Sequence, residues 1–535
     1  MYLHDLFYFM ILISQLNIVE SNCSRLELCT CDINEVICDA NYGNQTEHIN
    51  FSLFTSLPSV DSYYFRNFNE IPAYAFQNLT FLSNHAITIH LINVKVIRSN
   101  ALSTSMIIPD KSTISINIEL STNASSITLQ SNAFNGIKIN RLRFFNINNF
   151  NGRPIFDTNC FGENLQIGQL IFEQSGITGF STAAQKSTTV KYLRIHACPA
   201  FTQLTSKSLP SFLSTTESLE ISNTGLQLIN AYTFQSESLV LKELIIRDNS
   251  NFQMFSSNIV DGVLKHLEKL DLSNNPIDAL VENYDWSAYS YAKHLVLKQQ
   301  QIDLFLKTKI LNTLKHLRVI DFSEGFIQED NKDFIQNYFP DMPHLLSLNV
   351  SNANFTENMI ANLLGRLSNS INQTVTISLL GHTLHDRDFC LFYKIFQKTS
   401  NLLQLELDET HECNCIVDLF YNDKNESVAI DVTLKEPICL LNNTRARCDI
   451  PSQSIISKCP IDKPNPSGPG TNGNYGLAVA LIGVGVTILM ILIASGSVIA
   501  YRRRRGDRRS TVIDMEKPIE NPLTVIMAQR SHVSH

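Results

Sequence analysis

The chain has 535 residues, of which 44% are hydrophobic and only 17% are charged, and its net charge is −8. This balance supplies ample apolar side chains for a buried core, and it is typical of a secreted or membrane-attached protein rather than a highly charged cytosolic one. Because the chain has no bulk basic character, we expect no nucleic-acid partner.

The N-terminus begins with an apolar stretch, residues 6–16, that is too short to span a bilayer and resembles the core of a signal peptide. Val19 and Ser21 provide small side chains before a cleavage site at Asn22. The preceding residues include no Lys or Arg, which leaves a buried N-terminal helix as the alternative. We expect residues 1–21 to be a signal peptide, so that the following residues enter an oxidising compartment.

A repeated pattern occupies most of the chain. Residues 267–277 read LEKLDLSNNPI, which fits L-x-x-L-x-L-x-x-N-x-I, the signature of a leucine-rich repeat. About fourteen weaker or stronger copies, spaced by 23 to 29 residues, fill residues 51–410. With the second apolar position of each copy as its marker, the markers are Tyr63, Ile89, Ile118, Leu142, Leu170, Leu193, Leu219, Leu244, Leu270, Leu295, Ile320, Leu348, Ile377 and Leu405.

Each copy predicts one short strand followed by a turn, and stacked copies should pair their strands into one parallel sheet. The expected fold class is therefore an α/β solenoid, a leucine-rich-repeat horseshoe with the parallel sheet on its concave side. Asn249 and Asn275 occupy the position where a buried amide can hydrogen-bond the turn. The helical apolar periodicity of residues 359–367 and 388–396 predicts short helices on the convex side of the copies after Ile320.

Nine of the twelve cysteines form two clusters that flank the repeats. An open solenoid needs a capping element at each end, and small caps have too little core to be stable without disulfides. We therefore predict disulfide-stapled caps at residues 22–50 and 411–460. A zinc site is the alternative, which the oxidising compartment and the lack of nearby histidine pairs disfavour. The clustered cysteines are Cys23, Cys29, Cys31, Cys38, Cys413, Cys415, Cys439, Cys448 and Cys459.

The repeats and both cysteine clusters together resemble the extracellular leucine-rich-repeat family of single-pass membrane proteins with cysteine-rich flanks. The resemblance covers residues 22–460 and leaves Cys448 without a partner. Cys198, at the asparagine position of its copy, is expected to be buried and free, Cys390 to lie in the core as well, and Cys160 has no assigned role. The resemblance implies the disulfides Cys23–Cys31, Cys29–Cys38, Cys413–Cys439 and Cys415–Cys459.

A second apolar segment follows the C-terminal cysteines. Residues 476–500 carry no charge, and at about 1.5 Å per residue a helix of this length crosses a bilayer. Four arginines follow at residues 502–505, which places the C-terminal side in the cytoplasm. We predict a type I single-pass protein of the plasma membrane, with an extracellular N-terminus. Its last three segments are a stalk at 461–475, a transmembrane helix at 476–501 and a cytoplasmic tail at 502–535.

Ten Asn-x-Ser/Thr sequons precede the predicted transmembrane helix, and none follows it. Asn123 is not predicted to be glycosylated, because the repeat phase places it at a buried position. Asn349 is expected on the concave side, where a glycan would obstruct that surface. The predicted glycosylation sites are Asn22, Asn44, Asn50, Asn78, Asn349, Asn354, Asn372, Asn425 and Asn442.

The repeat phase also selects the residues that a partner could touch, since strand side chains alternate between the core and the concave surface. For the third copy it predicts Glu119 in this row. The fourth to eighth copies mix cationic and apolar groups, a composition typical of interface anchors, although an ordinary mixed surface is the alternative. The predicted partner-binding residues are Arg143, Phe145, Ile171, Arg194, His196, Ile245 and Arg247.

No catalytic motif or metal-ligand spacing stands out, so we expect neither enzymatic activity nor a cofactor. The family resemblance implies a cell-surface receptor or adhesion molecule that binds an extracellular or cell-surface protein. Its output could pass through a co-receptor or a second copy in the same membrane. It could instead pass through an adaptor recruited to residues 502–535, and a decoy or structural surface protein is the third possibility.

Overall fold

The computed structural model describes residues between Leu28 and Leu407. Residues 1–27 and 408–535 lie outside the described part, and with them the predicted signal peptide, C-terminal cap, stalk, membrane helix and tail. Among the described residues, no helix combines the length and hydropathy needed to span a membrane. The internal gaps are 33, 43–59, 78–85, 104–111, 122–125, 182–186, 236–237, 279, 281–283, 329–333, 371–372, 385–389, 391 and 393–402.

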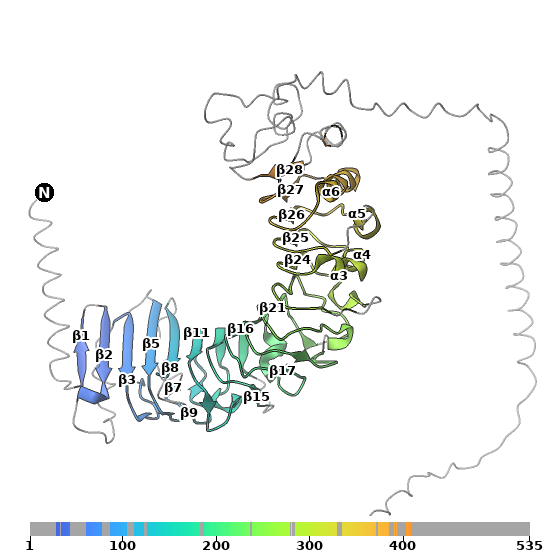
Figure 1. Ribbon diagram of the computed structural model, residues 1–535. Helices are drawn as coiled ribbons and strands as arrows, with labels where there is room; N and C mark the ends of the chain where they lie inside the picture. Colours follow the sequence, from blue (N-terminus) through green and yellow to red (C-terminus); the bar gives the residue numbers. More distant parts are fainter. Residues whose placement is uncertain are drawn as a thin grey trace, which may run out of the picture. The chain divides into compact units, whose positions relative to one another are not determined.

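One sheet of 16 strands runs along the described chain, and its strands follow one another in sequence order (Figure 1). β1 is antiparallel to β2, and every later neighbour in this sheet is parallel. The strands are β1 (Cys29–Cys31), β2 (Glu35–Asp39), β3 (Ser62–Arg66), β5 (Ala86–Ile92), β8 (Thr113–Glu119), β11 (Lys138–Phe145), β14 (Gln166–Glu173), β16 (Thr189–His196), β18 (Ser218–Ser222), β21 (Glu243–Arg247), β23 (Lys269–Asp271), β24 (His294–Val296), β25 (Val319–Asp321), β26 (Ser347–Asn349), β27 (Val375–Ser378) and β28 (Leu403–Glu406).

Short strands form a second layer behind the first half of this sheet (Figure 1). The main sheet lies on the inside of the curve, and we call its solvent face the concave surface. The second-layer strands are β4 (Glu70–Ile71), β6 (Val96–Ile97), β7 (Leu102–Ser103), β9 (Ser126–Leu129), β10 (Phe134–Asn135), β12 (Asn149–Phe150), β13 (Ile155–Phe156), β15 (Gly179–Phe180), β17 (Gln203–Leu204), β19 (Leu228–Ile229), β20 (Phe234–Gln235) and β22 (Val260–Asp261).

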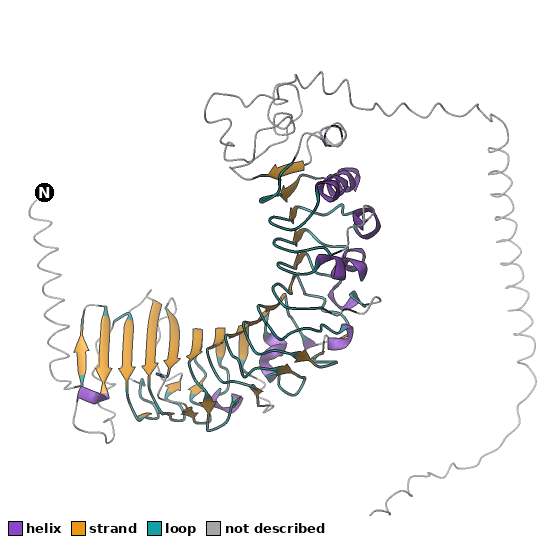
Figure 2. Cartoon of the chain, in the orientation of Figure 1, coloured by secondary structure: helices purple, strands orange, loops and turns teal. Residues whose placement is uncertain are grey.

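Helices replace the short strands behind the later part of the sheet (Figure 2). α6 covers the predicted helix at 359–367, whereas only Cys390 and Phe392 of the predicted helix at 388–396 are described. The α-helices begin in the copy marked by Leu295, earlier than predicted, because Ile302, Phe305 and Leu306 already bury one face of α3. The helices are α3 (Ile302–Lys307), α4 (Ile310–Thr313), α5 (Phe334–Tyr338) and α6 (Glu357–Ser370).

The strand register confirms thirteen of the fourteen predicted markers, which lie in one line of paired, buried residues. The third marker was wrong, because Ile116 and not Ile118 pairs with both Ile89 and Leu142. This strand carries isoleucine at every second position, and both candidates are fully buried, so the apolar pattern alone allows a shift of two residues.

The corrected register changes two expectations. Asn117, not Glu119, lies in the row of Arg143, and Glu119 lies in the row of Phe145. The equivalent of Asn249 in this repeat becomes Ser121, which is exposed. The repeat phase therefore no longer places Asn123 at a buried position, and Asn123 itself lies outside the described residues.

Most strands of the main sheet are followed by a residue with positive φ, four positions after the marker. Asn93, Asn274 and Asn352 are examples, with φ of 57°, 51° and 54°. Asparagine tolerates this left-handed conformation better than most residues. The backbone N–H of Asn93 donates to the Glu119 carbonyl at 2.8 Å, and that of Asn274 donates to the Lys298 carbonyl at 2.8 Å. These turns therefore join each repeat to the next.

In these turns the residue after the left-handed residue points into the core, and at Asn249 its side chain hydrogen-bonds buried backbone groups of the turn. Its side chain is fully buried, its Oδ1 accepts from the Thr224 N–H at 2.9 Å, and its Nδ2 donates to the carbonyls of Ile221 and Arg247 at 3.1 and 2.9 Å. Its own backbone N–H donates at 3.0 Å to Oδ1 of Asn275, the equivalent residue of the next repeat. We call this series of inward side chains, five positions after each marker, the ladder. Both predicted asparagines thus have the expected structural role.

Phenylalanine side chains fill the space between the two layers in the middle repeats. The ring centroid of Phe156 lies 4.9 Å from that of Phe172, 5.1 Å from Phe150, 5.2 Å from Phe144 and 5.3 Å from Phe161. Aromatic rings in edge-to-face or offset contact stabilise a core beyond the area that they bury. This cluster therefore holds the second layer against the sheet.

The sole tryptophan, Trp286, centres a second aromatic cluster further along the chain. It is fully buried, its ring centroid lies 4.2 Å from that of Tyr284, and its indole N–H donates to Thr308 Oγ1 at 2.8 Å. Its fluorescence therefore reports on the packing of the repeats around it.

The disulfide Cys29–Cys38, one of those that the family resemblance implied, closes the β1–β2 hairpin. Cys31 is also disulfide-bonded, with a partner outside the described residues. Cys198 is buried and free as predicted, and Cys160 is likewise buried and free. Cys390 packs against the core, as expected, but it is also disulfide-bonded, which the sequence did not indicate.

The Asn249 ladder yields a stability prediction. Asn249→Ala should lower the free energy of unfolding by about 3 kcal/mol, because it leaves several buried backbone groups without hydrogen-bond partners. Chemical denaturation followed by Trp286 fluorescence measures this change. Asn251→Ala, at an exposed position two residues later, is the matched control and should be close to neutral. Equal effects of the two substitutions would contradict the role of the ladder.

Candidate functional site

The structure brings all seven predicted partner-binding residues onto four strands of the concave surface, β11, β14, β16 and β21, with β18 lying between the last two. They lie in two rows that the strand register defines. The first row reads Arg143, Ile171, Arg194, Glu220 and Ile245, and the second reads Phe145, Glu173, His196, Ser222 and Arg247.

The centre of these rows is a buried carboxylate that the sequence analysis did not select. Glu220 is 4% exposed, and its Oε1 accepts from Arg247 Nη2 at 3.0 Å and from Ser222 Oγ at 2.9 Å. Arg194 Nε lies 3.4 Å from the same oxygen, and the Tyr192 hydroxyl donates to Oε2. We call Glu220, Tyr192, Arg194, Ser222 and Arg247 the Glu220 cluster.

The Glu220 cluster holds its charges in place. Burial alone would raise the pKa of Glu220, but the hydrogen bonds from Tyr192, Arg247 and Ser222 outweigh it, and the pKa lies below its usual range. Burial and the contact with Glu220 raise the pKa of Tyr192, which stays protonated and donates. Arg194 and Arg247 therefore neutralise a buried charge as well as facing solvent.

The predicted partner-binding residues were restricted to cationic, aromatic and apolar side chains. Glu220, the acidic residue that organises the cluster, was therefore not among them. Tyr192 shows a second cause. It lies one residue before the marker and shares the face of Arg194, whereas the predicted partner-binding residues all follow their markers. Strand alternation was the signal that could have identified it.

Two of the predicted apolar anchors contribute little surface. Ile171 is 4% exposed and Ile245 is 8% exposed. Ile171 pairs in register with Arg143 on one side and Arg194 on the other. These isoleucines therefore pack beneath the concave surface and offer little area for contact with a partner.

A second group of side chains extends the surface toward the N-terminus. Tyr64 and His90 stack with ring centroids 4.3 Å apart, and the Arg66 guanidinium lies 5.5 Å from the Tyr64 centroid. The Arg143 guanidinium lies 4.4 Å from the Phe145 centroid, and its Nε donates to Glu173 at 2.8 Å. A guanidinium group over the face of an aromatic ring is attracted to it electrostatically.

The charges of this group are incompletely balanced. Among the described residues, neither Arg66 nor the exposed Arg141 forms an ion pair. Burial, followed by the charges of Arg66 and Arg143, lowers the pKa of His90, which therefore stays neutral near pH 7. We call Tyr64, Arg66, His90, Arg141, Arg143 and Phe145 the cationic–aromatic patch.

The acidic side chains of the later strands serve the turns. Asp271 Oδ1 accepts from Ser273 Oγ at 2.6 Å, and Asp321 Oδ1 accepts from the Ser323 N–H at 2.9 Å. Asn349 Oδ1 accepts from the Ser351 N–H at 3.0 Å in the same way. The first row therefore changes along the sheet from groups available to a partner to groups engaged in local structure.

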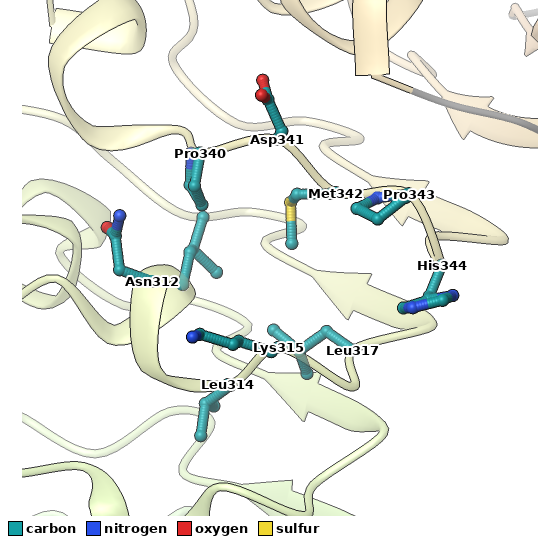
Figure 3. A pocket seen from close by; sticks show the side chains of 10 residues that line it. Asn312, Leu314, Lys315, Leu317, Pro340, Asp341, Met342, Pro343 and His344 are labelled. Carbon is teal, nitrogen blue, oxygen red and sulfur yellow. The ribbon is translucent and has the colours of Figure 1, made fainter. Parts of the chain in front are cut away.

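A pocket of about 450 Å³ lies between the segments that precede β25 and β26, away from the concave surface (Figure 3). Its lining includes the charged side chains of Lys315 and Asp341 and the imidazole of His344. Within the described residues, no group of three or more His, Cys, Asp or Glu side chains could hold a metal ion. His382 is buried, and its Nε2 lies 2.7 Å from the Val350 carbonyl, in the ladder position of its repeat.

Comparison of the sequence with models of known protein families gives no match, and comparison with curated proteins gives none either.

The Glu220 cluster predicts a pH-dependent contribution to stability. Because the pKa of Glu220 is lowered in the folded state, its ionised form stabilises the fold above its unfolded pKa of about 4.3, and this contribution is lost as the pH falls through the folded pKa. Glu220→Gln should therefore lower stability at pH 7 by about 1–3 kcal/mol, and the difference from the original chain should shrink below about pH 4. Urea denaturation at several pH values, followed by Trp286 fluorescence, measures it.

Glu217→Gln is the matched control for this experiment. Glu217 pairs with Lys242 at 2.7 Å, but both side chains are exposed, so its loss should have a much smaller effect. A difference for Glu220→Gln that stays constant down to pH 3 would contradict the proposed charge balance.

Proposed function

We propose that this chain is a cell-surface receptor or adhesion molecule whose leucine-rich-repeat ectodomain binds another extracellular or cell-surface protein. The observation that carries the proposal is the cationic–aromatic patch beside the Glu220 cluster on the concave surface. The continuous parallel sheet, with one marker residue in each repeat, supports the leucine-rich-repeat assignment. The signal-peptide and membrane-helix predictions support a type I single-pass protein in the plasma membrane.

Physical chemistry favours a protein partner at this surface. Arginine and aromatic side chains dominate binding energy at protein interfaces, and guanidinium groups that are already stacked lose less freedom on binding. Arg66 and Arg141 have no competing carboxylate among the described residues, so a partner's carboxylates could pair with them without breaking existing contacts. The proposed contact is thus preorganised.

Two alternatives differ in how the output is produced. In the first, the ectodomain acts through a co-receptor or a second copy in the same membrane. In the second, a recruited adaptor reads the tail, residues 502–535. Deletion of residues 510–535 separates them, since retained cellular output supports the first and loss supports the second. A decoy or structural surface protein would bind its partner but give no output with either form.

The structure also determines which arginines can test the surface. Reversal of Arg194 or Arg247 would place a second negative charge beside buried Glu220, so a loss of binding could result from misfolding. Arg66 and Arg141 lack this complication. Arg153 is the matched control, because it is exposed, forms no ion pair among the described residues, and lies between β12 and β13 in the second layer.

The binding prediction uses the full-length chain on cells, screened against a panel of extracellular proteins. For a partner found in the screen, the double variant Arg66→Glu, Arg141→Glu should weaken binding at least tenfold, a loss of about 1.4 kcal/mol or more. Arg153→Glu should leave the affinity unchanged, and surface staining shows that all variants are exported. Unchanged binding by the double variant would refute the proposed surface.

A further inference from the structure

We propose that Asn349 carries an N-linked glycan and that the neighbouring sequon at Asn354 does not, because the Asn354 carboxamide is engaged in a two-point contact with the Ile327 backbone. This inference rests on the proposed entry of the chain into the secretory pathway. It distinguishes two sequons, Asn-Val-Ser at 349–351 and Asn-Phe-Thr at 354–356, that lie only five residues apart.

Asn354 lies between β26 and α6, on the outer side of its turn. Its Oδ1 accepts from the Ile327 N–H at 2.6 Å, and its Nδ2 donates to the Ile327 carbonyl at 3.1 Å. Its backbone N–H donates to the Gly325 carbonyl at 3.1 Å. One side chain thus satisfies both backbone groups of a residue in the preceding repeat.

The same contact occurs in an earlier repeat, which identifies it as a device of this fold. Asn151 Oδ1 accepts from the Leu129 N–H at 2.7 Å, and its Nδ2 donates to the Leu129 carbonyl at 3.1 Å. The Asn151 backbone N–H donates at 2.8 Å to the carbonyl of Ile127, which lies two residues before Leu129, just as Gly325 lies two residues before Ile327. Asn151 is not part of a sequon, so its conformation serves structure alone.

Glycosylation and this contact compete for one hydrogen atom. In the transfer, Nδ2 forms a bond to the anomeric carbon of a lipid-linked oligosaccharide, the bond from that carbon to the diphosphate breaks, and Nδ2 loses a proton. The product is a secondary amide, which is planar and trans. The sugar then lies on the side of Oδ1, and the remaining N–H points the other way. The contact with Ile327 needs the hydrogen on the side of Oδ1.

Asn349 has no such conflict. It lies on β26, in register with Asp321 and Ser378 on the concave surface. Its Oδ1 accepts from the Ser351 N–H, a bond that a glycosylated amide keeps. Its Nδ2 makes no hydrogen bond within the part of the chain that the structure describes. A glycan here would cover the concave side of β25–β27 and leave the cationic–aromatic patch open.

The test uses the full-length chain expressed in a mammalian cell line. Enzymatic release of N-glycans in ¹⁸O-labelled water converts each glycosylated Asn to labelled Asp, which peptide mass spectrometry locates. We expect the label at Asn349 and an unmodified Asn354. A labelled Asn354 or an unlabelled Asn349, with label at other sequons, would overturn this inference alone. Absence of label at every sequon would overturn the proposed function as well.

Two substitutions make the result independent of peptide detection. Asn349→Asp removes the glycan but keeps the acceptor, as Asp321 does in the preceding repeat, and should remove one glycan's shift in electrophoretic mobility. Thr356→Asp destroys the Asn354 sequon but keeps a side-chain cap for α6, since Thr356 Oγ1 accepts from the Met359 N–H at 3.4 Å. It should leave the mobility unchanged, and a shift equal to one glycan would contradict the inference.

Discussion

Hydrogen bonding of the turn after each strand is the constraint on which the solenoid depends. A buried turn leaves backbone N–H and C=O groups that must find partners, and an unpaired group costs as much as a lost hydrogen bond. Left-handed residues such as Asn93 donate to the next repeat, while buried side chains satisfy the groups inside. The inner position of several repeats carries a hydrogen-bonding side chain of varying type, whereas Phe68, Val94, Ile147, Gly325 and Ala353 occupy it in others. Its hydrogen-bonding occupants include Ser175, Cys198, Thr224, Asn249, Asn275, Gln300 and His382.

This constraint explains how far the sequence could predict the fold. The apolar markers and their spacing determined the strand register, because a buried line of residues tolerates little else. The pattern failed at Ile118, where alternate isoleucines fit two registers equally well. The early start of the helices at α3 was visible in the spacing of Ile302, Phe305 and Leu306 but was not used.

The site was harder to predict than the fold, because its properties arise between strands. The phase correctly placed Arg194 and Arg247 on one surface, but it could not show that the Glu220 carboxylate between them is buried and paired with both. It could not show that Ile171 is buried, since exposure depends on the side chains of the neighbouring strands. Cross-strand pairs of this kind follow from the register and not from any local motif. The Asn354 contact with Ile327 belongs to the same class.

The β1–β2 hairpin has a consequence for how copies of the chain meet. A parallel sheet with an open first edge would present a row of unpaired backbone groups, on which the sheet of another molecule could grow. Among the described residues, β1 ends the sheet instead with three residues that run in the opposite direction, bonded to β2 by Cys29–Cys38. The short antiparallel strand thereby disfavours edge-to-edge pairing of this sheet with the sheet of a second molecule. Contacts between crowded copies at this edge would then be made by side chains.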